Sequence, residues 1–86
     1  MVQKYSKLFP QILHLDDEQL YKCFAVHMIH NIAYVIAKST DKIKIEKLKR
    51  LLSTIEKYGE NTDLKDLEAK GFDEELFHNE LCKILL

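Results

Sequence analysis

The chain has 86 residues, of which 47% are hydrophobic and 31% are charged, and its formal net charge is −1. This length corresponds to a single domain over residues 1–86, and the scarcity of glycine (2) and proline (1) argues against a hairpin-rich β protein. No stretch reaches the roughly 18 uncharged apolar residues of a membrane-spanning helix, so we expect no membrane association.

The cysteine content is low, and the N-terminal residues lack the apolar segment of a signal peptide. Cys23 and Cys82 are too few for a disulfide framework, although one bridge between them stays open. We therefore expect a soluble cytoplasmic protein with reduced thiols.

The first half of the chain predicts an N-terminal arm followed by a long helix. Pro10 starts either a turn or a short helix. The stretch "LDDEQL" then carries a capping box, with Asp16 at the N-cap and Gln19 at the third helical position. No residue breaks the pattern before the triplet "STD", and apolar side chains surround most of the helix, which predicts a buried central helix over residues 17–38.

The second half predicts three further helices. Residues 42–58 have apolar side chains at helical spacing, and Gly59 follows as a stop residue. The triplet "NTD" caps a short helix that ends before Gly71, and Asp73 caps the last helix. The prediction is an all-α bundle of about four to five helices: three long, one short and connecting, and the N-terminal arm. The expected core residues are Phe24, Met28, Ile32, Leu48, Leu52, Ile55, Phe77 and Leu81.

Histidine and cysteine recur on two of these helices. Cys23, His27 and His30 share one helix face, and His78 and Cys82 have a similar spacing on the last helix. Zinc accepts such ligands, but neither C-x2-C nor H-E-x-x-H is present. We expect no metal and no cofactor, with one of His27 and His30 buried or in a groove beside the last helix. Because no glycine-flanked nucleophile or phosphate-binding loop is present, we expect no enzyme.

Charge is divided along the chain. Residues 38–50 carry six basic and two acidic groups, whereas residues 56–80 carry nine acidic and three basic groups. The simplest interpretation is two solvated helix faces; the functional one is that one region meets a charged partner, because such fields speed association. Aromatic residues among the acidic ones suit a basic protein partner. The predicted partner-binding residues are Tyr58, Glu60, Asp63, Asp66, Glu68, Phe72, Asp73, Glu74 and Glu75.

The basic region provides an alternative site. Its side chains could follow the phosphates of a nucleic acid, but the chain has one arginine and a pI of 6.4, and no recognition helix follows a tight turn. Nucleic acid is therefore the less favoured partner. The residues of this alternative site are Lys42, Lys44, Lys47, Lys49 and Arg50.

Four stretches together resemble short bacterial proteins that act as immunity partners of secreted toxins. They are "KLFPQI", "LYKCFAVHMIHNIAYVIA", "LKRLLSTIEKYGE" and "KGFDEEL", and the resemblance covers roughly residues 7 to 77. The chain departs from that pattern at Asp73, where an apolar residue is usual after the phenylalanine. The resemblance implies a small non-enzymatic protein that neutralises or regulates a partner protein. The alternatives are a nucleic-acid-associated regulator or phage-type modulator, and a structural subunit of a larger assembly; a homodimer also stays open.

Overall fold

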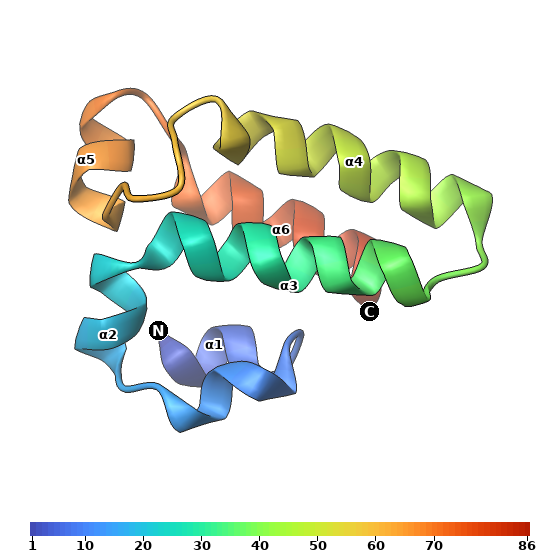
Figure 1. Ribbon diagram of the computed structural model, residues 1–86, viewed down its shortest axis with the longest axis horizontal. Helices are drawn as coiled ribbons and strands as arrows, with labels where there is room; N and C mark the ends of the chain where they lie inside the picture. Colours follow the sequence, from blue (N-terminus) through green and yellow to red (C-terminus); the bar gives the residue numbers. More distant parts are fainter.

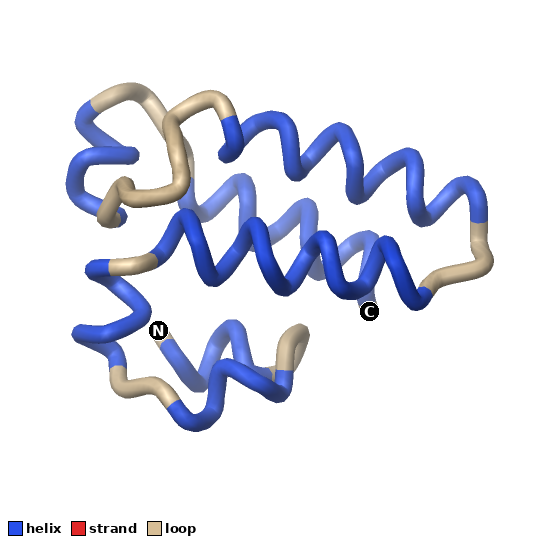
Figure 2. The backbone as a smooth tube through the Cα atoms, viewed as in Figure 1, coloured by secondary structure: helices blue, strands red, loops and turns tan.

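Three helices of 12 to 15 residues form the frame of the fold: α3 (Phe24–Lys38), α4 (Lys42–Glu56) and α6 (Glu74–Leu85). The computed structural model describes residues 1–86 and contains no strand (Figure 2). In Figure 1, α3 lies between α4 on one side and the N-terminal segment on the other, with α6 behind. The shorter elements are α1 (Val2–Ser6), the 3-10 helix η1 (Pro10–His14), α2 (Asp17–Lys22) and α5 (Leu64–Ala69).

The all-α class predicted from the sequence is confirmed, but the long helix expected over residues 17–38 is interrupted. Cys23 adopts φ −119° and ψ 34°, which separates α2 from α3. Leu20 of α2 is fully buried, and α2 packs against both α3 and α5. A straight helix of these 22 residues would be about 33 Å long. Such a helix would place α2 away from α5. The break is therefore explained by tertiary packing, because no glycine or proline lies at this position.

The predicted helix ends are confirmed where side chains cap them. Asp16 accepts a hydrogen bond from the Gln19 amide at 2.7 Å, and the Gln19 side chain accepts one from the Asp16 amide at 2.9 Å. Asp41 caps α4 by accepting hydrogen bonds from the Ile43 and Lys44 amides. Gly59 has φ 89°, a left-handed conformation that favours glycine, and α4 ends three residues earlier than this stop signal, at Glu56.

The core is centred on aromatic rings from distant parts of the chain. Phe24 is fully buried, and its ring centroid lies 5.5 Å from that of Tyr5 in α1 and 6.2 Å from that of Phe77 in α6. All expected core residues are buried except Leu52, which is half-buried because α4 turns Leu48, Leu51 and Ile55 inward instead. None of the helices is both long enough and apolar enough to cross a membrane.

Candidate partner-binding site

An open groove runs between α4 and α6 and has two sections. The first, which we call the basic section, has a volume of about 340 Å³ and is bordered by Lys47, Arg50 and Lys83. The second, the aromatic section, has a volume of about 270 Å³ and is lined by Tyr58, Phe72, Asp73, Leu76 and Phe77 among others. Leu51, Thr54 and Glu80 line both sections, so the two are continuous.

The groove exists because the apolar stripes of its two helices do not meet along their whole length. On α6, the buried residues are Phe77 and Leu81, four positions apart and therefore on one face. Leu76 directly precedes Phe77, and because neighbouring positions are turned by about 100° in an α-helix, its side chain points away from that face and is 57% exposed. Leu76 thus stands at the edge of the aromatic section as an uncovered apolar side chain.

The acidic residues predicted to bind a partner divide into structural and free groups. Asp63 accepts a hydrogen bond from the Asp66 amide at 2.8 Å, and Asp73 accepts one from the Leu76 amide at 3.0 Å, so both are N-caps. Glu74 is half-buried and ion-paired with Lys4. The carboxylates of four exposed residues have no basic group within ion-pairing distance: Glu60, Asp66, Glu68 and Glu75.

The two aromatic residues of the predicted site are less accessible than the sequence suggests. Phe72 is only 8% exposed, and its ring packs on Phe24, Tyr58 and Phe77. It is therefore a core residue rather than an exposed anchor. Tyr58 is half-buried, with the ammonium group of Lys57 5.1 Å from its ring centroid, and it borders the aromatic section. The exposed apolar contact beside the acidic residues is supplied by Leu76 instead.

The basic residues of the alternative site lie together on α4. Lys44 is half-buried and the others are exposed, and none of them takes part in an ion pair. The first turn of α4 contains no acidic residue, and Lys42 and Lys44 lie near its positive end. The helix dipole disfavours cations there, so these lysines do not serve the stability of α4. The residues of this group, which we call the basic row, are Lys42, Lys44, Lys47, Lys49 and Arg50.

The two ends of the molecule consequently carry opposite charge. The α4 helix begins at the end where α6 finishes, whereas α5 and the first turn of α6 lie at the opposite end (Figure 1). The charge division in the sequence is therefore also a division in space, and the α4–α6 groove connects the two charged ends.

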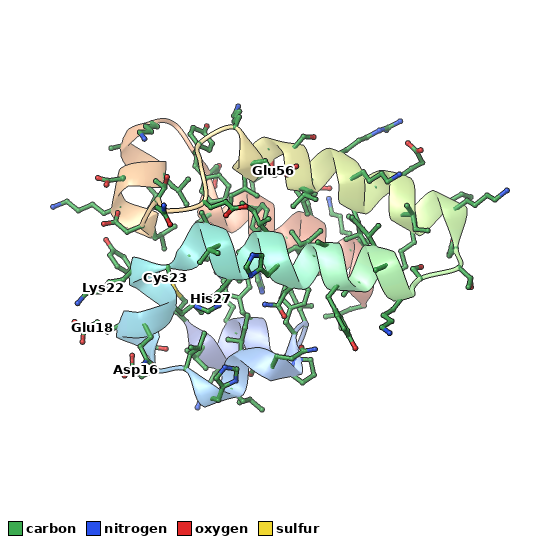
Figure 3. The ribbon with its side chains drawn as sticks, in the orientation of Figure 1. Asp16, Glu18, Lys22, Cys23, His27 and Glu56 are labelled. Atoms are coloured by element: carbon green, nitrogen blue, oxygen red, sulfur yellow. The ribbon has the colours of Figure 1, made fainter.

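The histidines and cysteines do not converge on one site. His30 is exposed; His27 is half-buried, and burial lowers its pKa, with further lowering by His30 and by His14 of η1. The titratable groups near His27 thus come from α3 and η1, whereas the sequence predicts a groove beside the last helix. Cys23 is exposed at the α2–α3 junction, one helical turn before His27 (Figure 3), and both cysteines are free thiols. No three His, Cys, Asp or Glu side chains form a group that could hold a metal ion.

A contact between α1 and α6 has no counterpart in the sequence pattern. Lys4 Nζ lies 2.8 and 3.0 Å from the two carboxylate oxygens of Glu74, 70 positions along the chain. The Tyr5 and His78 ring centroids are 5.0 Å apart, and Cys82 Sγ is 3.6 Å from His78 Nε2. Burial lowers the pKa of His78, and the positive charge of Lys4 lowers it further. These contacts with α1 leave His78 and Cys82 half-buried, so this side of α6 is partly covered.

Comparison of the chain with protein-family models, with curated proteins and with solved structures gives no match. The fold defines the chain as a small all-α domain, and its function has to be inferred from the surface just described.

Proposed function

We propose that the protein is a small non-enzymatic binding protein that neutralises or regulates a partner protein, in the manner of a toxin-immunity protein. The observation that supports this most is the position of the free acidic side chains. Glu75 precedes the exposed Leu76 at the aromatic section, and α5 with Asp66 and Glu68 lies at the same end of the molecule. An apolar contact beside unpaired carboxylates suits a basic protein surface.

The charges and the apolar contact have different roles in this proposal. Free carboxylates at the acidic end would draw a basic partner and orient it, which raises the association rate more than the affinity. Leu76 and the half-buried ring of Tyr58 would supply the desolvated contact on which affinity depends. Asp63 and Asp73 serve the fold as N-caps, so their substitution would not separate binding from stability.

The test is a comparison of charge variants against a partner recovered with the wild-type protein from its native host. The acidic-end variant carries Asp66→Lys, Glu68→Lys and Glu75→Lys, none of which is an N-cap or in an ion pair. Surface plasmon resonance at low salt should show association slowed by about tenfold or more. At high salt the difference should shrink, because exposed charges are screened.

A matched control uses Lys42→Glu, Lys47→Glu and Lys49→Glu, which change the net charge by the same amount in the opposite sense. These substitutions should leave partner association unimpaired. Slower association in this control, together with unchanged association in the acidic-end variant, would contradict the proposal. Circular dichroism of each variant shows whether the fold is retained.

A second candidate function follows from the basic row. Its five side chains are free of ion pairs, and two of them, Lys42 and Lys44, lie in the first turn of α4 against the helix dipole, so they are available to contact phosphates. A gel-shift titration with duplex and single-stranded DNA at two salt concentrations tests it. Salt-sensitive binding at micromolar concentration or below, lost in the Lys42→Glu, Lys47→Glu, Lys49→Glu variant, would favour this function over the first.

A further inference from the structure

The α4–α6 groove has opposite charges at its two ends. Lys47, Arg50 and Lys83 border the basic section. At the far end, Asp73 lines the aromatic section, and Glu75 lines a shallow hollow that also includes Leu76. Lys57 also lies at this far end, where its ammonium group is held over the ring of Tyr58. An occupant that fits both ends must therefore carry the opposite order of charge along its length.

A second copy of the protein, rotated by half a turn, presents this opposite order of charges along its own groove. A two-fold axis through the middle of the groove exchanges the basic section of one copy with the aromatic section of the other. Lys47, Arg50 and Lys83 then face Asp73 and Glu75 at both ends of the contact. We propose that the α4–α6 groove is the interface of a symmetric homodimer, closed by this isologous contact. The dimer covers Leu76, the contact also proposed for the partner, so a second copy and the partner compete for the aromatic section; the tests below use the protein alone.

The middle of the groove contains one contact that favours the dimer and one charge repulsion that opposes it. Leu76 is 57% exposed beside the aromatic section, so in the dimer it can enter the partner copy's groove, where Leu51 provides apolar surface. Glu80 lines both sections and therefore lies near the axis, where two copies of it approach each other. Its ion pair with Lys83, at 3.4 Å, offsets part of that repulsion.

The first test measures mass against concentration. Sedimentation equilibrium of the purified protein at low salt, between about 10 and about 500 µM, should show a shift from 10.2 kDa towards twice that mass. Leu76→Asp should raise the dimer dissociation constant by about tenfold or more. Leu13→Asp is the control, because Leu13 is 64% exposed on η1, away from the groove, and it should leave the dimer intact. A monomer at every concentration, or a dimer insensitive to Leu76→Asp, overturns the proposal.

The second test determines the orientation of the two copies. The variant Lys47→Glu, Arg50→Glu makes both ends acidic, whereas Asp73→Asn, Glu75→Lys removes the acidic end while asparagine keeps the helix cap. Each variant alone should be monomeric, because its two ends no longer complement each other. An equimolar mixture should form a heterodimer, which native mass spectrometry distinguishes from either homodimer. Homodimers of the separate variants, or no heterodimer in the mixture, would refute the two-fold arrangement.

A third substitution locates the axis. Glu80→Gln removes the like charges that meet at the centre, so the dimer dissociation constant should fall. An unchanged or higher dissociation constant would place the axis elsewhere and refute this register.

Discussion

Replacing Phe24 with alanine tests whether the aromatic centre holds the domain together. The side chain has no exposed surface, and its ring lies 5.5, 6.0 and 6.2 Å from the rings of Tyr5, Phe72 and Phe77. A buried Phe→Ala substitution costs about 3–5 kcal/mol through lost transfer energy and the remaining cavity. Each aromatic pair adds about 0.5–1.5 kcal/mol, which places the expected loss at the upper end of that range.

That loss is large for a domain of this size. At roughly 0.05–0.15 kcal/mol per residue, the whole domain has a free energy of unfolding of about 4–13 kcal/mol. Urea titration followed by far-ultraviolet circular dichroism gives the difference in free energy of unfolding between the wild type and Phe24→Ala, provided that both proteins have the same urea dependence. Leu13→Ala is the control, because Leu13 is exposed and its loss should cost less than about 0.5 kcal/mol. A loss below about 1 kcal/mol for Phe24→Ala would refute the central packing described here.

Three further substitutions probe polar groups. Tyr5→Phe should leave stability unchanged or raise it by about 1 kcal/mol in urea titration, because the buried hydroxyl makes no hydrogen bond of good geometry, although burial and then the nearby Glu74 carboxylate raise its pKa; a clear loss would show that the hydroxyl does bond to Glu74. Asp73→Ala should cost about 1 kcal/mol through the lost helix cap, whereas exposed Asp66→Ala should cost less than half of that; equal losses would argue against the cap. The pKa values of His27 and His78 lie below the ordinary 6.5, chiefly because burial disfavours the charged imidazolium. Unfolding therefore takes up protons, so the free energy of unfolding should fall as the pH drops through 6.5. The double variant His27→Gln, His78→Gln should show a smaller fall in urea midpoints measured from about pH 8 to about pH 5. An unchanged pH dependence in this variant would show that the two histidines are not its origin.

The helix ends could be predicted from the sequence because the interactions that make them are local. Asp16 and Gln19 need only each other's backbone and side chain, and Asp73 needs only the amide three residues later. Gly59 is recognised by its own conformational freedom. Each signal lies within four residues of its effect, so a single sequence contains all the information required.

The features that the sequence did not predict depend on contacts between distant residues. The break at Cys23 follows from the packing of α2 on α5, and the pairing of Lys4 with Glu74 joins residues 70 positions apart. Phe72 lies in an acidic stretch, which suggests exposure, yet the helices around it form a pocket for its ring. The α4–α6 groove also depends on how two helices approach each other, for which the sequence gives no separate signal.

The interruption at Cys23 also affects how the domain moves. Because α2 has Leu20 as its one buried residue and is otherwise held to the N-terminal segment by the Val2 amide, which donates to Asp17 at 2.8 Å, it can open locally while α3 remains folded. Its amide protons should then exchange with solvent faster than those in the middle of α3, where five residues are buried. A continuous helix would have linked the two segments into one cooperative unit. The short α2 instead gives the domain a segment with its own opening equilibrium, set next to a solvent-accessible thiol.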